Sequence, residues 1–179
     1  MRSPLSWLSW LLKCCASANL AHVPLFATSL KTPIGTLNLL ADDQILIGSN
    51  LTTISAFNAD SEVKIVKVIP VISDLINDYF DGDFSAINAI KVRQSGAAFS
   101  QGAWKAMRKV SAGKTISYAD LAQKAGSPAA VRAAGSACAN NAIMLVVPCH
   151  RIVKTGGALG NYASGVDKKE WLLRHEGYF

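Results

Sequence analysis

The sequence predicts a soluble protein with an α/β N-terminal module and a mainly α-helical C-terminal module that contains a helix-turn-helix. Its 179 residues suffice for one ordinary domain or two small ones. Hydrophobic residues make up 50% of the chain and charged residues 17%, a composition that supports a packed core and argues against global disorder. Strand-like patterns come first along the chain and helical patterns follow, so the two modules are consecutive.

Residues 1–25 form a leader that we expect to be disordered or loosely packed, because they show no clear periodicity. A secretory signal peptide is the alternative, since a short apolar run precedes the small residues Ala16-Ser17-Ala18. Lys13 interrupts that run and limits the apolar stretch Pro4–Leu12 to far fewer than the roughly 18 residues of a membrane-spanning helix. The chain is therefore not expected to cross a membrane.

Residues 26–92 are predicted to form the α/β domain. Turn residues separate three β-prone stretches, at Phe26–Lys31, Thr36–Leu40 and Ile45–Ile47. Apolar side chains at helical spacing predict a helix over Val68–Phe80, and a short strand is expected over Ile87–Val92. The acidic residues of this part lie at turns and helix ends, so it offers no convincing catalytic constellation.

Residues 93–179 are predicted to form a second, helical domain. One apolar face predicts its first helix, through Phe99, Ala103, Ala106, Met107 and Val110. Ser117 and Asp120 have the spacing of a capping box, which predicts a short second helix over Tyr118–Ala125.

The third predicted helix begins with Ser127 as the N-cap and Pro128 in the first helical position, and it ends at Ala139. With Gly126 ending the second helix, the pair is a helix-turn-helix candidate. Arg132 is the one long hydrogen-bonding side chain of this helix, which makes it a poor reader of base sequence. We expect it to lie close to a duplex, with Arg132 projecting where a base has been displaced. The alternative is a small-residue helix buried against its neighbours, with Arg132 as a surface charge.

The excess positive charge lies in the C-terminal part of the chain. From Gln94 onward, the chain has 11 Lys and Arg residues and 4 Asp and Glu residues, a net charge of +7, whereas the residues before Gln94 have a net charge of −1. This asymmetry suggests a surface that binds a polyanion. A solvated basic face that keeps the protein soluble is the alternative.

The most specific feature is an apolar segment that holds Cys149 next to His150 and Arg151. A cysteine is nucleophilic as the thiolate, which a nearby histidine and arginine favour. The alternative is a small core residue beside a satisfied histidine, whereas a zinc site that adds Cys138 has spacings that fit no common ligand pattern. The 4 cysteines of the chain are too few and too irregularly placed for a disulfide framework, so a reducing compartment is the default.

Several motifs around this cysteine are specific in combination. Asn141 precedes Cys149 by eight residues, and the motifs are Pro148-Cys149-His150-Arg151, Gly160-Asn161-Tyr162, Lys169–Leu173 and His175–Gly177. Residues 94–179 thereby closely resemble the O6-alkylguanine-DNA alkyltransferases, also called methylated-DNA–protein-cysteine methyltransferases. The similarity before residue 94 is diffuse.

The resemblance implies direct-reversal DNA repair, in which a methyl or alkyl group moves irreversibly from O6-alkylguanine in DNA to Cys149, once per molecule. O4-methylthymine is a further candidate substrate. His150 would deprotonate the thiol through a water, and Glu176 would orient and charge that histidine. Asn141 would brace the turn that carries the site. Tyr118 would press on the target phosphate and help proton transfer to the guanine.

The resemblance also implies which residues meet DNA and which form the pocket. Arg132 would fill the gap left by the flipped nucleotide, and the other expected DNA-binding residues are Ala130, Ala133, Ser136 and Arg151. The pocket would be lined by Leu159, Gly160 and Asn161, with Tyr162 and Lys169 against it. The family often has Ser where this chain has Ala163, a difference that bears on one pocket hydrogen bond.

For the fold, the resemblance implies a ribonuclease-H-like N-terminal module and a winged-helix-like C-terminal module. It further implies no cofactor and no metal, and a monomer that binds double-stranded DNA without sequence specificity. The location would be the cytoplasm, close to the nucleoid, or the nucleus of a eukaryote. Two other functions stay open. A non-catalytic damage-sensing protein of this fold would lack the acceptor cysteine, and a Cys-His hydrolase would turn over repeatedly on small acyl substrates.

Overall fold

The computed structural model describes residues 24–59 and 62–179. The predictions of a leader and of a signal peptide therefore lie outside the described residues, apart from the last two positions of the leader. Within the part of the chain that the structure describes, no helix is long and apolar enough to span a membrane.

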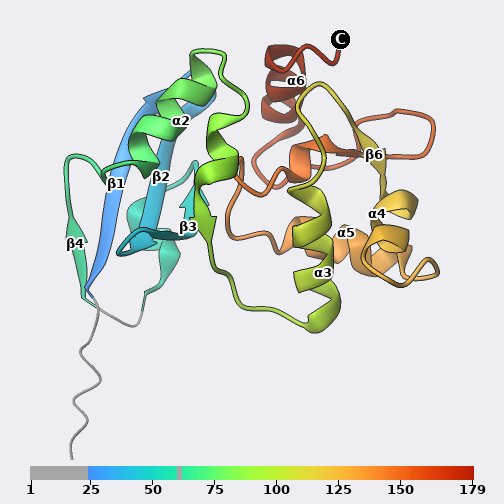
Figure 1. Ribbon diagram of the computed structural model, residues 1–179, viewed down its shortest axis with the longest axis horizontal. Helices are drawn as coiled ribbons and strands as arrows, with labels where there is room; N and C mark the ends of the chain where they lie inside the picture. The colour runs from blue at the N-terminus through green and yellow to red at the C-terminus, as the bar shows by residue number, and fades with distance from the viewer. Residues whose placement is uncertain (1–23, 60–61) are drawn as a thin grey trace, which may run out of the picture.

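A five-stranded mixed sheet forms the N-terminal half of the molecule (Figure 1). Its order is β4-β1-β2-β3-β5, with β1 at Leu25–Thr32, β2 at Gly35–Asp42, β3 at Ile45–Asn50, β4 at Val63–Ile65 and β5 at Lys91–Val92. The first three strands are antiparallel, whereas β4 runs parallel to β1 and β5 runs parallel to β3. The three strands predicted from the sequence are confirmed.

Helix α2 (Ile72–Phe80) lies against one face of this sheet, where Ile76 and Tyr79 are buried (Figure 1). It begins later than the expected start at Val68. Val71 has a positive φ of 65°, which breaks the backbone geometry of a helix just before Ile72.

The strand expected over Ile87–Val92 is wrong for most of its length, because Ala86–Ala89 forms the 3-10 helix η2 and pairing begins at Lys91. The carboxylate of Asp83 accepts hydrogen bonds from the N–H and the hydroxyl of Ser85 at 3.0 and 2.6 Å. These bonds form a turn just before the expected strand and lead into η2, where the N–H of Asn88 donates to Ser85 O at 2.9 Å in place of strand pairing. A further 3-10 helix, η1, was not predicted and spans Ile54–Phe57.

Four helices follow in the C-terminal half: α3 at Ala98–Met107, α4 at Tyr118–Lys124, α5 at Val131–Ala139 and α6 at Val166–His175. Two short parallel strands, β6 (Ile116–Ser117) and β7 (Ile152–Val153), pair beside them. The predicted capping box is confirmed, since the Ser117 hydroxyl and the Asp120 carboxylate each accept the other residue's N–H at 3.0 Å.

Helix α5 begins at Val131, so the expected start at Pro128 is wrong. Ser127 belongs instead to the C-terminal cap of α4, where its N–H donates to the carbonyl of Ala122 at 3.0 Å. Gly126 takes the left-handed position of this cap at a φ of 91°, as the sequence predicted. The residues between the two helices therefore form the C-terminal cap of α4, and α5 begins only after them.

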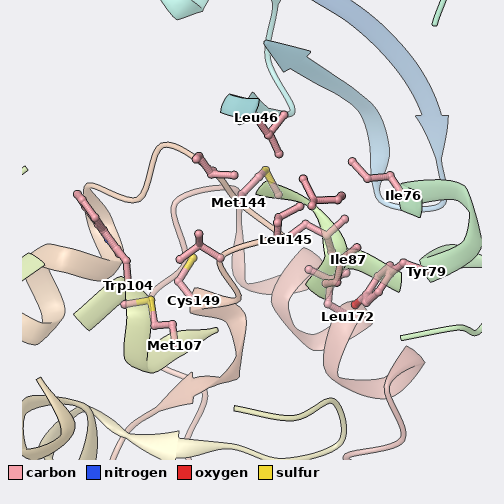
Figure 2. Close-up of a cluster of buried hydrophobic side chains, with 14 of the residues drawn as sticks. Leu46, Ile76, Tyr79, Ile87, Trp104, Met107, Met144, Leu145, Cys149 and Leu172 are labelled. Atoms are coloured by element: carbon pink, nitrogen blue, oxygen red, sulfur yellow. The ribbon is translucent and has the colours of Figure 1, made fainter. Parts of the chain in front are cut away.

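One cluster of buried side chains joins the sheet to the helical half. Leu46 of β3 and Leu145, which precedes the site, belong to it (Figure 2). Ser49 at the end of β3 also donates its N–H to Ala142 O and its hydroxyl to Met144 O, both at 2.8 Å. The division of the chain at residue 92 stays a prediction, since the two parts share this core.

Candidate active site

A short, irregular segment after α5 carries the predicted nucleophile. Cys149 opens the 3-10 helix η3 (Cys149–Arg151), and its side chain lies at the edge of the core with the residue 7% exposed (Figure 2). Its N–H donates to Val147 O at 2.8 Å. Leu145 has a positive φ of 71°, a conformation that a branched side chain adopts only where its surroundings enforce it. Packing therefore holds this segment in one unusual conformation.

Asn141 ties this segment together. Its side-chain N–H group donates to Val147 O at 2.8 Å and to Cys149 Sγ at 3.2 Å, while its side-chain oxygen accepts the N–H of Ile143 at 3.1 Å. The amide thus spans the turn on both sides and points one donor at the reactive sulfur. Asn141 therefore has the contacts needed to brace the turn that carries the site, the role that the resemblance implied.

His150 and Glu176 form a fully buried pair, with 2.9 Å between His150 Nε2 and Glu176 Oε1. An ionised carboxylate can only accept, so the ring proton lies on Nε2 and Nδ1 is the basic nitrogen. Nδ1 is buried and has no hydrogen-bond partner among the described residues. The ring therefore presents an unengaged base on the side away from Glu176.

The Glu176 carboxylate has three further donors. Arg151 donates through Nε at 2.9 Å and Nη2 at 2.8 Å, and the Tyr79 hydroxyl donates at 2.6 Å. Burial raises the pKa of Glu176, but the bonds and charges of His150 and Arg151 outweigh it and hold that pKa well below its usual range. Glu176 is therefore a carboxylate at neutral pH.

The resting thiol is protonated. Burial raises the pKa of Cys149, against the smaller effects of the Asn141 hydrogen bond and the Lys169 charge. Burial also lowers the pKa of His150, against the opposing pull of Glu176, so the ring is neutral at pH 7. The expectation that neighbouring His and Arg residues favour the thiolate is therefore wrong for the resting site: His150 is uncharged and the charge of Arg151 is paired with Glu176.

The DNA contact expected of Arg151 is also wrong. This residue is 2% exposed, and its guanidinium is occupied by Glu176 and by Val110 O, to which Nη1 donates at 2.5 Å. A side chain enclosed in this way has no path to a phosphate. Its charge instead neutralises the buried carboxylate.

A cavity of about 560 Å³ opens beside Cys149. Its walls come from the start of α4, from α5 and from the loop after β7: Tyr118, Val131, Arg132, Gly135, Cys138, Ala139, Cys149, Lys154, Gly160, Asn161, Tyr162 and Ala163. Leu159 does not line this cavity, although the sequence placed it there. Gly160 is needed at its position because a Cβ would come within 3.3 Å of the Tyr118 hydroxyl, and its φ of 69° suits glycine.

Lys169 supports the pocket from behind. It is fully buried on α6, and its ammonium donates to Ile152 O at 2.5 Å and to Leu159 O. These bonds attach the loop after β7 to helix α6. Leu159 therefore serves the pocket through its backbone carbonyl.

On the helix expected to meet DNA, Arg132 and Ser136 are exposed, while Ala133 is half-buried. Ala130 is the residue just before the helix and is also half-buried. The Ser136 hydroxyl donates to Arg132 O at 3.2 Å, one turn earlier. The exposed face of α5 thus carries small side chains around a single arginine that also borders the cavity.

Comparison with known proteins places this site in a family. The model of the 6-O-methylguanine DNA methyltransferase DNA-binding domain matches residues 98–178. A methylated-DNA–protein-cysteine methyltransferase of Methanosarcina acetivorans is 36% identical over 118 residues, which cover 66% of this chain and 75% of that protein. The chain belongs to the methylated-DNA–protein-cysteine methyltransferase family.

Other members of the family agree with this assignment. The Shigella flexneri methylated-DNA–protein-cysteine methyltransferase is 43% identical over 107 residues, or 60% of this chain. The match spans 63% of the length of that relative. The crystal structure of the Mycobacterium tuberculosis O6-methylguanine methyltransferase superposes with a TM-score of 0.72 at 29% identity and covers 85% of this chain and 92% of that one. The mixed sheet and the helices are thus a fold shared within the family.

Tyr79 and part of the cavity wall were missed in the sequence; the missed wall residues are Val131, Gly135, Cys138, Ala139 and Lys154. Tyr79 lies in the N-terminal half, 97 residues before Glu176 in the chain, and bonds to it. The one sequence feature that pointed to Tyr79 was its place in a helix end with diffuse similarity to the family. Cys138 lines the cavity with Cys149, and burial raises its pKa to about 12. It was considered as a zinc ligand, but the described residues contain no group of three or more His, Cys, Asp or Glu side chains that could hold a metal.

Proposed function

We propose that this protein repairs DNA by direct reversal, transferring a methyl or alkyl group from O6-alkylguanine irreversibly to Cys149. The observation that carries the proposal is a cysteine at the wall of a cavity of about 560 Å³, next to a buried His150–Glu176 pair and beside a helix that presents Arg132. O4-methylthymine is a second candidate base for the same pocket.

The chemical step is a displacement at the alkyl carbon. The Cys149 proton passes through a water to Nδ1 of His150, and the sulfur lone pair forms a bond to the carbon. The bond between that carbon and guanine O6 breaks, its electrons stay on the guanine, and a proton neutralises the leaving base. The thioether on Cys149 has no easy leaving path, so each molecule acts once.

Tyr118 is the proposed proton donor and phosphate contact. It lines the cavity, and burial raises the pKa of its phenol, with Cys138 and Cys149 adding to the rise. The phenol therefore keeps its proton at neutral pH and can supply one to the leaving base.

The proposed DNA surface is the exposed side of α5. The small residues Ala133 and Ser136 on this helix, with Ala130 just before it, permit close approach to a duplex, and Arg132 takes the place of the flipped nucleotide. The Mycobacterium tuberculosis OGT protein has been crystallised in complex with DNA, and that structure matches this chain with a TM-score of 0.73 at 27% identity. Few side chains here can read base edges, so binding is independent of sequence.

The finer description of the fold belongs to the same proposal. The antiparallel β1-β2-β3 meander with β4 parallel to β1 supports a ribonuclease-H-like module. Helices α4 and α5 with the β6–β7 pair support a winged helix-turn-helix module. We further propose that the protein is a monomer in the cytoplasm, close to DNA, and works without cofactor or metal.

The hydrolase alternative has less support from the geometry. A hydrolase of this kind requires a hydrogen bond between the nucleophilic cysteine and its histidine base. Among the described residues, Cys149 accepts a side-chain hydrogen bond from Asn141 and makes none with the His150 ring. The damage-sensing alternative requires loss of the acceptor cysteine, and Cys149 is present.

The proposed function is tested by mixing excess protein with a duplex that contains O6-methylguanine and measuring loss of the modified base. Wild type and Cys138→Ala should restore guanine, whereas Cys149→Ala should leave the lesion intact while still binding the duplex. Cys138 is the matched control because it lines the same cavity. Repair by Cys149→Ala would overturn the assignment.

A further inference from the structure

We propose that Tyr79 is a positioning residue for the transfer reaction: its hydroxyl fixes the Glu176 carboxylate and thereby sets the basicity of His150. The inference rests on the proposed function. Tyr79 lies on α2, in the half of the molecule that holds none of the residues assigned to the chemistry. It is fully buried, and its hydroxyl donates to Glu176 Oε1 at 2.6 Å.

Tyr79 and His150 share one acceptor atom. The same Oε1 receives His150 Nε2 at 2.9 Å and Arg151 Nη2 at 2.8 Å. A hydroxyl bonded to a carboxylate oxygen withdraws negative charge from it. The charge that Glu176 offers to the imidazole is therefore smaller with Tyr79 in place than without it.

A cluster of aromatic side chains surrounds the Tyr79 ring, whereas its hydroxyl is held by the bond to Glu176. Phe80 and Phe84 pack edge-to-face against the Tyr79 ring, with centroids 5.2 and 5.7 Å away. His175, the residue before Glu176, packs at 5.6 Å and has its Nε2 3.2 Å from Tyr79 O. The cluster thus joins α2 to the C-terminal end of α6, next to Glu176.

The direction of the effect follows from the protonation states. Arg151 neutralises Glu176 in either state, but a protonated His150 gains more from the electron density on Oε1 than a neutral ring does. Without the Tyr79 donor, Oε1 keeps more of that density. Removing the Tyr79 hydroxyl therefore favours the protonated ring, and the pKa of His150 rises. Burial and the neighbouring carboxylate raise the pKa of Tyr79 itself, so the phenol stays a donor throughout the working range.

Other charged and titratable groups also face this pair and must be kept constant. They are Arg151 and Cys149 on η3, Lys169 and His175 on α6, and Tyr162 in the loop after β7. A single-atom change at Tyr79 leaves all of them in place.

The test is the pH dependence of single-turnover methyl transfer in Tyr79→Phe, with Phe84→Leu as the matched control. Phe84→Leu disturbs the same aromatic cluster but removes no hydrogen bond to Glu176. We expect the acidic limb of the Tyr79→Phe profile to move about one pH unit upward, a change of about 1.4 kcal/mol. The control should keep the wild-type limb even if it is less stable. An unmoved limb in Tyr79→Phe, or an equal shift in the control, would overturn the proposal.

A second measurement is independent of DNA. The ring signals of His150, assigned with a His150→Gln variant, are titrated by NMR in the same proteins, and the pKa should rise only in Tyr79→Phe. Replacing Tyr79 with 3-fluorotyrosine, a stronger hydrogen-bond donor, should lower the pKa of His150. This second variant keeps the test decisive if Tyr79→Phe folds poorly. If wild type failed to transfer methyl, the proposed function would fall, whereas this titration would still decide the role of Tyr79.

Discussion

Glu176→Gln removes the charge on which the buried part of the site depends. The carboxylate accepts four hydrogen bonds, from Tyr79, from His150 and twice from Arg151. Glutamine has nearly the same shape, but one carboxylate oxygen becomes an amide group that donates. That group would face donors, and Arg151, 2% exposed, would lose its counter-charge.

The loss of stability can be worked from these contacts. Breaking a buried ion pair by removing one partner costs about 3–5 kcal/mol, because an uncompensated charge stays behind. We therefore expect the free energy of unfolding of Glu176→Gln to fall by about 3–5 kcal/mol at pH 7. The substitution should also slow methyl transfer, with little change in DNA affinity, because Glu176 is assigned no phosphate contact.

Urea unfolding at pH 7 measures this difference by linear extrapolation. The control is Arg151→Met in the Glu176→Gln background, which removes the orphaned charge and should restore more than half of the loss. A loss below about 1 kcal/mol, the value of a solvated ion pair, would show that Glu176 and Arg151 do not form a buried, mutually dependent pair.

The same carboxylate predicts a pH dependence. The folded pKa of Glu176 lies below its ordinary value of about 4.3, so its stabilising effect is complete above that pH and is lost as pH falls toward the folded pKa. The gap in stability between wild type and Glu176→Gln should therefore narrow below about pH 4. A constant gap down to pH 3 would show that the loss is steric.

Three further outcomes follow from other parts of the site. Arg132→Ala should slow repair of duplex DNA and spare reaction with free O6-benzylguanine, and stopped-flow rates that fell equally for both would contradict its role. Lys169→Met removes the donor of Ile152 O and Leu159 O, so unfolding in urea should show a loss of about 1–3 kcal/mol, whereas a neutral effect would mean that water replaces the ammonium. Burial lowers the pKa of folded His150 below its ordinary value of about 6.5, so urea unfolding should show wild type losing more stability than His150→Gln as the pH falls from about 7 to about 5.5; parallel stability curves would contradict this.

The features that local sequence determines were predicted well. The first three strands have turn residues between them, and the capping box needs two residues three positions apart. Competition between local signals caused the errors. Ser127 could cap either of two helices and serves α4. The turn at Asp83 and Ser85 leads into a 3-10 helix where the apolar pattern suggested a strand.

The site was predicted less evenly, for a physical reason. Cys149 and His150 are adjacent, so their pattern is visible in the sequence. Arg151 was taken for a surface residue because its buried partner Glu176 lies 25 residues further on. Tyr79 carries no local mark of its bond to Glu176, since its neighbours in the chain fit an ordinary helix end. The burial and ionic partners of a polar residue follow from the fold.

The most direct test of the central claim is the amount and position of transferred label. Wild-type protein is incubated with excess duplex that carries labelled O6-methylguanine, and protein-bound label is followed to completion, with the modified peptide identified by mass spectrometry. We expect a plateau of about one methyl group per chain, held as a thioether on Cys149. Label that accumulates on Cys138, or lesion loss that continues far beyond one per chain, would contradict single transfer to Cys149.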